Sequence, residues 1–478
     1  MNTMDVDVAV IGAGTAGLAA YRAARMRGKR VALIESGPYG TTCARVGCMP
    51  SKLLIAAAEA AHGLASAPAF GVFPGKVSID GGAVMARLRS ERDRFVAFVL
   101  DGMQQIPAAD KILGRARFAG PRELRIDGHT TLHAGAIVIA TGSTAILPAQ
   151  WQAAGERVIA SDAVFDWADL PQSVAVLGSG VIGLELGQAL HRLGVRVSIF
   201  ARGAKVAQLS DPLVLQAAQR ALGAHLDLRF GASISAIASD GAGLRIGSRD
   251  AAGKESSERF DYALVAVGRS PNLGELGLEL ARLELDERGV PLYDRQTMQC
   301  GDSAIFIAGD ADNERPVLPE AADQGKIAGA NAALYPDVAP GLRRTPLTIA
   351  FTEPQIATVG ARYSDLCGNI QFAIGAVSFE NQGRSRVMLQ NEGLLRVYGE
   401  LGTGRFLGAE MFGPRAEHLG HLLAWACQAG LTVAAMLDMP FYHPVVEEGV
   451  RSALRDLAAQ LAPAVTAPPP CPDCTPGT

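Results

Sequence analysis

Residues 6–17 read Val-Asp-Val-Ala-Val-Ile-Gly-Ala-Gly-Thr-Ala-Gly, and this stretch sets the architecture of the first part of the chain. Its apolar half predicts a buried strand over 6–11, and the residues that follow, 18–26, predict a helix. Gly12 and Gly14 allow a tight turn and a close approach of the backbone to a pyrophosphate, whereas Gly17 lets the helix pack against the strand. The order strand, glycine loop, helix therefore predicts a dinucleotide-binding βαβ unit.

The next predicted strand, 31–34, ends at Glu35, which lies 23 positions after Gly12. A carboxylate at this point accepts hydrogen bonds from ribose hydroxyls, so we expect the adenosine ribose of the bound dinucleotide to carry a free 2′-hydroxyl. A glycine triplet alone is weak evidence, but a strand, a helix and an acid in the right order make the prediction specific.

The same pattern returns between a predicted strand over 174–177 and a predicted strand over 195–200. The glycines of this second fingerprint are Gly178, Gly180 and Gly183. The position equivalent to Glu35 is Ala201, which is followed by Arg202. A missing carboxylate beside a guanidinium favours a 2′-phosphate, so we predict NADPH here, with NADH as the alternative. In that alternative Arg202 is a solvated loop residue, and Lys205 is the only other cation nearby.

Three later apolar stretches, 136–140, 262–267 and 305–308, read as buried strands that end in glycine turns. The turns are Thr141-Gly142, Gly268-Arg269 and Gly309-Asp310. Ligands of α/β sheets bind at the carboxyl ends of strands, so Asp310 is placed to accept from a ribityl or ribose hydroxyl. The alternative for Asp310 is a turn-forming residue without a ligand.

Cys43 and Cys48 lie in the stretch 42–52, Thr-Cys-Ala-Arg-Val-Gly-Cys-Met-Pro-Ser-Lys. On an ideal helix this spacing separates their Cα atoms by roughly 8–9 Å, whereas a disulfide spans about 7 Å at most. A bridge therefore requires a distorted helical turn, which Gly47 permits and Pro50 helps to set. A strained pair at a helix start, where the dipole favours a thiolate, suits a reversible redox disulfide. The alternative is two buried cysteines without redox function.

The composition of the 478 residues, 49% hydrophobic and 19% charged, is typical of a soluble, well-packed chain of several domains. A net charge of −4 without a basic block predicts neither a nucleic acid nor a membrane as partner. We find no signal peptide at the start and no uninterrupted run of about 18 apolar residues, so we expect no membrane-spanning helix. Seven cysteines are then not a structural disulfide framework, and we expect a cytoplasmic location.

From Pro346 onward the pattern changes to that of a third domain without a glycine fingerprint. Strands are predicted over 348–351, 353–360, 394–399 and 406–412, with helices over about 416–429 and 446–461. The predicted fold class is therefore α/β, with two Rossmann-like dinucleotide-binding domains and a C-terminal α+β domain.

The two fingerprints and the cysteine pair resemble the pyridine-nucleotide–disulfide oxidoreductase family, class I, most of all its dihydrolipoamide dehydrogenase-like members. The resemblance runs from Asp5 to about Leu461 and implies a homodimer whose active site is shared between subunits. It implies an FAD-binding domain over 1–147 and 268–344, an NAD(P)H-binding domain over 148–267, a dimerisation domain over 345–461 and a flexible tail over 462–478.

The resemblance also assigns cofactor contacts. For FAD it implies Gly12, Gly14, Gly17, Glu35 and Asp310, and for the nicotinamide dinucleotide Gly178, Gly180 and Gly183; Thr141, Gly142, Gly268 and Arg202 complete the candidate cofactor-binding residues. Lys52 matches a lysine near the flavin ring, and Glu185 matches the glutamate that pairs with it. A cation at this place favours the reduced, anionic flavin.

The family's catalytic base comes from the partner subunit, in a His-Pro-x-x-x-Glu run that here reads His443-Pro444-Val445-Val446-Glu447-Glu448. By this resemblance His443 exchanges the thiol proton, and Glu448 orients its imidazole and raises its basicity. Glu447 is the less favoured orienting residue. The two valines replace small hydroxyl residues that are common in the family.

The resemblance implies an FAD-dependent enzyme that moves electrons between NAD(P)H and a disulfide through Cys43 and Cys48. Cys48 is the thiolate nearer the flavin, and Cys43 attacks the substrate, which is a small molecule, a lipoyl protein or a redox protein. The alternatives are a mercuric or soft-metal reductase, a thioredoxin-reductase-like enzyme, and a docking subunit of a multienzyme complex with negligible turnover. We predict no resident metal.

A proline-rich tail ends the chain with Cys471-Pro472-Asp473-Cys474. Its prolines predict an extended, semi-rigid arm. The cysteine pair is a second dithiol relay, half of a metal site or incidental, and the sequence leaves these three readings open. The other three cysteines, Cys300, Cys367 and Cys427, are isolated in the sequence, and we expect them to be ordinary packing residues.

Overall fold

The computed structural model describes residues 2–461, and these divide into two compact units. The first unit comprises residues 2–53, 86–146 and 268–344, and the second comprises 54–85, 147–267 and 345–461. The predicted cysteine tail lies outside the described residues. The two compact units do not coincide with the three predicted domains, because the second unit contains the predicted NAD(P)H-binding and dimerisation domains together with residues 54–85. The division into three domains stays a prediction.

The first unit is built on one sheet with the order β3-β2-β1-β6-β5-β4, and β17 pairs with β6 on the other edge of the parallel part. β1, β2, β3, β6 and β17 run parallel, whereas β4 and β5 are antiparallel additions. The strands are β1 (Asn2–Ile11), β2 (Val31–Glu35), β3 (Lys111–Leu113), β4 (Ala116–Gly120), β5 (Glu123–Ile126), β6 (Thr130–Ile139) and β17 (Ile305–Ile307), with a separate ribbon of β7 (Ser143–Ala145) and β16 (Arg269–Pro271).

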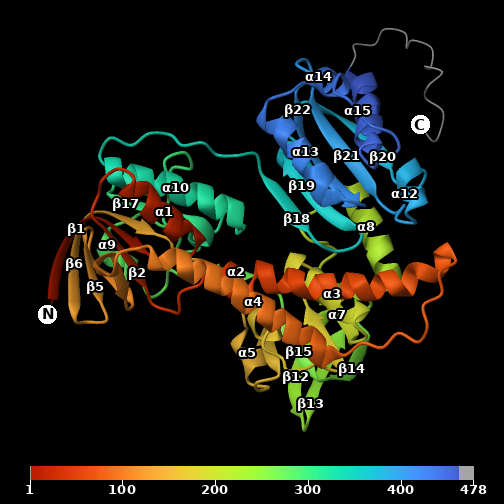
Figure 1. The fold of residues 1–478 in the computed structure, drawn as a ribbon, viewed down its shortest axis with the longest axis horizontal. Helices are drawn as coiled ribbons and strands as arrows, with labels where there is room; N and C mark the ends of the chain where they lie inside the picture. Colours follow the sequence, from red (N-terminus) through yellow and green to blue (C-terminus); the bar gives the residue numbers. More distant parts are fainter. Residues whose placement is uncertain (1, 462–478) are drawn as a thin grey trace. The chain divides into compact units, whose positions relative to one another are not determined.

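Two helices cover one face of this sheet, α1 (Thr15–Arg25) and α10 (Leu318–Leu334), which lie side by side in Figure 1. Their close approach requires glycine at two positions of α10, because a Cβ atom on Gly325 or Gly329 would lie 2.2 Å from a backbone oxygen of α1. Burial of the apolar residues between helices and sheet is the main stabilising term of this layer. The remaining short elements are α2 (Thr42–Val46), α9 (Leu278–Ala281) and the 3₁₀ turns η2 (Ala108–Asp110) and η3 (Gly309–Asp312).

The second unit contains a parallel sheet with the order β11-β10-β9-β15-β8. Its elements are β8 (Val158–Ala160), β9 (Ser173–Leu177), β10 (Arg196–Ala201), β11 (Asp227–Phe230), β15 (Tyr262–Val265), α5 (Ala149–Gln152), α6 (Ser161–Val164), α7 (Val181–Arg192) and α8 (Pro212–His225). An antiparallel meander of β12 (Ser233–Asp240), β13 (Gly243–Arg249) and β14 (Glu255–Phe260) is inserted before β15. The placement of α7 directly after β9 repeats the β1–α1 arrangement of the first unit.

The same unit contains an antiparallel sheet with the order β18-β19-β22-β21-β20. Figure 1 shows α13 and α15 on one face of this sheet, whose apolar residues form a single core. The elements are β18 (Leu347–Ala350), β19 (Gln355–Gly360), β20 (Phe372–Ser378), β21 (Leu394–Glu400), β22 (Phe406–Gly413), α11 (Tyr363–Leu366), α12 (Gly383–Val387), α13 (Ala416–Gln428), α14 (Val433–Leu437) and α15 (Glu448–Leu461). The predicted fold class, two Rossmann-like folds followed by an α+β segment, is confirmed.

The long helices α3 (Cys48–Ser66), followed by the 3₁₀ turn η1 (Ala67–Phe70), and α4 (Gly81–Gln104) each run from one unit into the other along the chain. Within the described residues, the stretch Thr42–Phe70 is long and apolar enough to span a membrane by length and composition. Sequence analysis predicted no such helix because charged residues interrupt the stretch. Since a helix of a water-soluble protein can pass the same test, the absence of a membrane partner stays a prediction.

Candidate active site

The cysteine pair lies where one helix stops and another starts. Thr41, with φ of +56°, caps α2 by accepting a hydrogen bond from the Ala44 N–H at 3.3 Å. Helix α2 ends at Val46, and α3 begins at Cys48, with Gly47 between them at φ −128° and ψ −114°. The turn is crowded, because a Cβ on Gly47 would lie 3.1 Å from the carbonyl oxygen of Thr42. The helix is therefore interrupted between the cysteines, as a contact between the sulfurs requires.

In this structure Cys43 and Cys48 are two thiols joined by a side-chain hydrogen bond. This hydrogen bond and burial raise the pKa of Cys43, whereas the positive charge of Lys52 acts in the opposite direction. Cys43 is half-buried and Cys48 is exposed. The hydrogen bond brings the two side chains together, as closure of a dithiol to a disulfide requires.

The first glycine fingerprint forms a cradle at the amino end of α1. Gly12 has φ of +106°, and a Cβ there would lie 2.3 Å from the carbonyl oxygen of Ala140. A Cβ on Gly17 would lie 1.8 Å from the carbonyl oxygen of Gly12, which confines this position to glycine. The space at Gly14 is open to 4 Å, at the N-cap of α1, where helix N–H groups receive a phosphate.

Glu35 lies beside this cradle and ties the loop together. Its Oε2 accepts a hydrogen bond from the Ala13 N–H at 2.7 Å, and its Oε1 accepts from the Gly37 N–H at 2.8 Å. A carboxylate has about four acceptor positions, so ribose hydroxyls can bind as well. Two buried hydroxyls of this unit, those of Thr141 and Tyr39, have no hydrogen-bond partner among the described residues. An open phosphate cradle, an acid and unpartnered hydroxyls fit FAD.

The second fingerprint repeats this geometry at the amino end of α7. Gly178 has φ of +119°, and a Cβ there would lie 2.4 Å from the carbonyl oxygen of Ala266. A Cβ on Gly183 would lie 2.1 Å from the carbonyl oxygen of Gly178, whereas the space at Gly180 is open. Two cradles of the same shape, one in each unit, fit two dinucleotides.

Asp310 lies in η3, after β17, and is held by Ser143, which sequence analysis did not name, and through it by Arg269, which was named only as part of a turn. Its Oδ2 accepts a hydrogen bond from the Ser143 hydroxyl at 2.7 Å. Arg269 donates in turn to the Ser143 hydroxyl at 2.8 Å and to its carbonyl at 2.7 Å. The turns at Gly142 and Gly268, with φ of +68° and +137°, place this ribbon. Ser143 and Arg269 carry no motif, and only the pairing of β7 with β16 reveals them.

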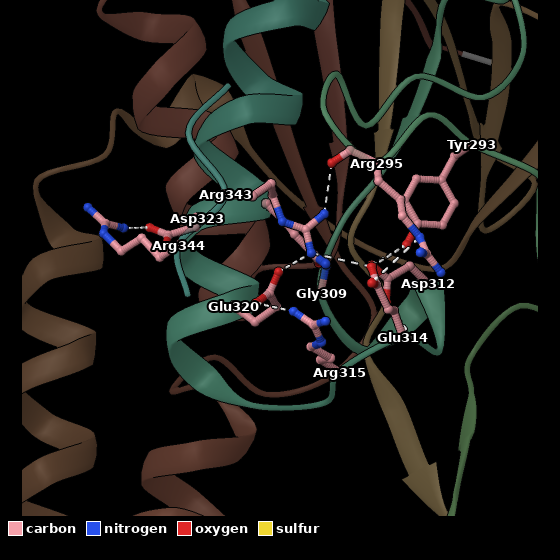
Figure 2. A network of polar contacts seen from close by, with 11 residues as sticks. Tyr293, Arg295, Gly309, Asp312, Glu314, Arg315, Glu320, Asp323, Arg343 and Arg344 are labelled. Atoms are coloured by element: carbon pink, nitrogen blue, oxygen red, sulfur yellow. Dashed lines mark hydrogen bonds and ion pairs between the residues drawn. The ribbon is translucent and has the colours of Figure 1, made fainter. Parts of the chain in front are cut away.

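A polar network follows Asp310 in the chain (Figure 2). Arg343 lies between Glu314 and Glu320 and hydrogen-bonds both of them. The Tyr293 hydroxyl lies 3.1 Å from a carboxylate oxygen of Asp312 and 2.9 Å from one of Glu314. Burial raises the pKa of Asp312 to about 6. The network therefore holds a nearly buried acid that changes charge close to neutral pH.

His443 and Glu448 form the pair that the motif predicts. Nδ1 of His443 lies 3.1 Å from each carboxylate oxygen of Glu448. The carboxylate of Glu448 is nearly buried and accepts two further hydrogen bonds, from Arg451 at 3.1 Å and from the Val445 N–H at 3.3 Å. The imidazole itself is 59% exposed, which leaves Nε2 accessible. Arg451, the third charged member, was not foreseen, because its position is outside the motif.

Glu185 and Lys52 lie in different units, so their predicted pairing stays a prediction. Glu185 is buried on α7, and its Oε1 accepts a hydrogen bond from the Phe351 N–H at 2.9 Å. Within the described residues no group of three or more histidine, cysteine, aspartate or glutamate side chains could hold a metal ion.

Two dinucleotide cradles and a dithiol at a helix break define the class of a flavin- and pyridine-nucleotide-dependent oxidoreductase. Residues 6–325 match the family described as pyridine nucleotide-disulphide oxidoreductase, and residues 347–454 match the dimerisation domain of that family.

Proteins of known name match along nearly the whole chain. Dihydrolipoyl dehydrogenase of Thermus scotoductus is 31% identical over 95% of this chain and 98% of its own length. Mercuric reductase of Acidithiobacillus ferrooxidans is 30% identical over 94% of this chain and 82% of its own length. The crystal structure of LpdA from Mycobacterium tuberculosis superposes with a TM-score of 0.81 and 25% identity, over 95% of this chain and 99% of that one.

The chain therefore belongs to the pyridine nucleotide-disulphide oxidoreductase family. It is an FAD-dependent enzyme of the dihydrolipoyl dehydrogenase type that works with a pyridine nucleotide and a disulfide. Its third segment is a dimerisation domain, which supports a homodimer.

Proposed function

We propose that this protein uses NADPH to reduce a disulfide substrate of the lipoyl class. The names of its relatives point to a lipoyl dithiol as the substrate. The observation that carries the choice of nucleotide is the loop after β10, which presents Arg202 and Lys205 at the second cradle and no carboxylate at Ala201. We also propose a cytoplasmic location, because the cysteines of residues 2–461 are free thiols, which suit a reducing compartment.

Two hydrogen bonds support this assignment of the loop. The Ser179 hydroxyl, in the second glycine loop, donates to the carbonyl oxygen of Lys205 at 2.6 Å. The Ala207 N–H donates to the carbonyl oxygen of Ser179 at 3.0 Å. Both bonds hold residues 205–207 against the second glycine loop, and the exposed Arg202 and Lys205 belong to the loop that is attached in this way, where a 2′-phosphate would lie.

The proposed reaction with the substrate needs only thiol exchange. His443 of the partner subunit takes the proton of the Cys43 thiol, and the resulting thiolate attacks one sulfur of the substrate disulfide, so that a mixed disulfide forms and the substrate S–S bond breaks. The released sulfur takes this proton back from His443. Cys48 then loses its proton and attacks Sγ of Cys43, which closes the Cys43–Cys48 disulfide and releases the second substrate sulfur, which takes up a proton in turn. His443, oriented by Glu448, keeps the proton transfer at the sulfur that needs it.

FAD, when bound, supplies the two-electron connection between the reduced nicotinamide and the cysteine disulfide. The residues that would hold it are those of the first cradle, Glu35 and Asp310. Lys52 would provide positive charge near the flavin, with Glu185 as its counter-ion. All steps are reversible, so an excess of dihydrolipoamide with NADP⁺ would run the sequence backwards.

The experiment that tests the proposal compares NADPH with NADH in steady-state turnover of the holoenzyme. Lipoamide, oxidised glutathione and oxidised thioredoxin serve as acceptors, and dihydrolipoamide serves as donor in the reverse direction. We expect kcat/KM to be at least about tenfold higher with NADPH, and lipoamide to be the best acceptor. Equal or better turnover with NADH contradicts the choice of nucleotide, and a preference for another acceptor contradicts the choice of substrate.

Mercuric reduction is the second candidate, favoured by the relative from Acidithiobacillus ferrooxidans. The His443–Glu448 pair weighs against it, because reduction of a soft metal ion needs no base directed at a thiol. NADPH oxidation driven by Hg(II) in excess of thiol ligand, at a rate above that with lipoamide, would reverse this ranking.

A further inference from the structure

The loop of residues 202–211, between β10 and α8, is attached to the rest of the unit at both ends. Its first attachment is the pair of hydrogen bonds to Ser179 described above. At the first attachment Ala207, whose N–H makes one of these bonds, adopts φ of +48°, a left-handed conformation that costs a non-glycine residue about 1 kcal/mol or more. A strained residue persists only where its surroundings hold it, so the shape of this loop is imposed by its anchors.

The second attachment is Glu410, a fully buried residue on β22 of the dimerisation domain. Its Oε2 accepts hydrogen bonds from the backbone N–H groups of Ser210 at 2.6 Å and Asp211 at 3.0 Å. Its Oε1 accepts from the Ser210 hydroxyl at 2.5 Å and from the Tyr363 N–H at 2.9 Å. Four donors surround this carboxylate, and three of them belong to the end of the loop.

Asp211 continues the same connection into α8 and β21. It is fully buried, and its Oδ1 caps α8 by accepting from the Leu213 N–H at 3.0 Å. Arg396 of β21 donates to both carboxylate oxygens at 2.9 Å, and the Tyr398 hydroxyl donates at 3.1 Å. Burial and the neighbouring acids raise the pKa of Tyr398, so its hydroxyl remains a donor. The loop end is therefore fixed by side chains from two adjacent strands of the dimerisation sheet.

We propose that Glu410 is a positioning residue for the pyridine nucleotide, because it fixes the loop that presents Arg202 and Lys205 to the 2′-phosphate. This inference rests on the proposed preference for NADPH. Two long exposed side chains lose conformational freedom when they bind a phosphate, and a loop that is already fixed reduces the loss. The dimerisation domain thus takes part in the choice between NADPH and NADH, through contacts far along the sequence from the fingerprint.

The variant that tests this inference is Glu410→Gln, assayed with both nucleotides. Glutamine keeps the shape but places an NH₂ group against N–H donors, so the loop end loses at least one hydrogen bond. We expect the KM for NADPH to rise about 5- to 10-fold with kcat nearly unchanged, and the KM for NADH to change less than about twofold. NADH lacks the 2′-phosphate, so a loss of loop position leaves it unaffected. If Glu410 had only a structural role, the KM values for NADPH and for NADH would rise together.

Two further variants keep the test decisive. Ser210→Ala removes one hydroxyl that donates to Glu410, and it should raise the KM for NADPH about two- to threefold even if Glu410→Gln does not fold. Glu353→Gln is the matched control, because Glu353, between β18 and β19 of the dimerisation sheet, also binds the nucleotide domain, through Arg192 of α7 at 2.7 Å. Its KM values for both nucleotides should stay at the wild-type level.

The outcomes separate the two proposals. A wild-type enzyme that prefers NADH overturns the choice of nucleotide and this inference with it. A wild-type enzyme that prefers NADPH, combined with Glu410→Gln and Ser210→Ala variants in which both KM values shift equally or neither shifts, overturns this inference alone.

Discussion

Glu447 and Glu448 are adjacent in sequence, yet the structure gives them different surroundings. Glu448 is the nearly buried acid of the pair, and its carboxylate contacts the imidazole of His443 and the guanidinium of Arg451. The reason is helical geometry, because α15 begins at Glu448 and turns this side chain back toward the residues before the helix. A negative charge held at Nδ1 keeps the imidazole in the orientation that leaves Nε2 for the substrate sulfur.

We predict that Glu448→Gln lowers kcat with a disulfide substrate by about 10- to 100-fold. Glutamine accepts a hydrogen bond from Nδ1–H but carries no charge to stabilise the protonated imidazole. Steady-state turnover at saturating nucleotide measures the effect. Glu447→Gln is the matched control and should keep kcat within about twofold of wild type. A Glu447→Gln variant that loses as much activity would transfer the orienting role to that residue.

The short turn η3, which follows β17, contains a buried aspartate whose charged form is destabilised by burial. Asp312 is 6% exposed, accepts the Glu314 N–H at 2.8 Å, and shares the Tyr293 hydroxyl with Glu314. Burial raises its pKa to about 6. Between the ordinary aspartate pKa and this value the folded protein binds more protons here than the unfolded chain does, so this group lowers stability as the pH rises from about 4 to about 6.

We predict that Asp312→Asn removes this dependence, because asparagine keeps the acceptor oxygen and has no charge to bury. The difference in melting temperature, variant minus wild type, should grow between pH 4 and pH 6 and level off above pH 6. Differential scanning calorimetry of the FAD-loaded enzyme measures it. A difference that is constant over this range would mean that Asp312 does not titrate there. Asp302→Asn, at a site outside the network, serves as the control for a general charge effect.

In the homodimer, the cysteines and the base of one active site are predicted to come from different subunits. Cys43 and Cys48 are proposed to face His443 of the partner subunit, so each active site draws on both chains. A closed twofold dimer then has two equivalent sites, each with one contribution from either side.

We predict that a mixed dimer of Cys48→Ser and His443→Gln subunits, purified through two different tags, keeps about half of the wild-type activity. In such a dimer one site carries both lesions and the other carries none. A mixed dimer of Cys48→Ser and Cys43→Ser subunits is the control, and it should be inactive because both sites are damaged. Loss of all activity in the first dimer would place His443 and the cysteines of one site in the same chain.

The sequence by itself was sufficient to predict the two dinucleotide folds, the cysteine pair at the helix start and the His443–Glu448 motif. Each of these is a local pattern. At Gly12 and Gly178, for example, the backbone lies so close to a neighbouring segment that only glycine fits. The meander β12–β14 escaped detection, because outer strands such as β12 and β14 are largely exposed and lack a strong apolar run. Strand β20 was not predicted either, although most of its residues are apolar.

The contacts that needed the tertiary structure are those between residues far apart in the chain. Ser143 meets Asp310 across 167 positions, and Ser210 meets Glu410 across 200. No local pattern marks Ser143, Ser210 or Glu410, because an acid obtains its hydrogen-bond donors from whichever segments the packing brings to it. The linear order of residues thus defines which chemistry the chain carries, and the packing of distant strands defines how each group is held.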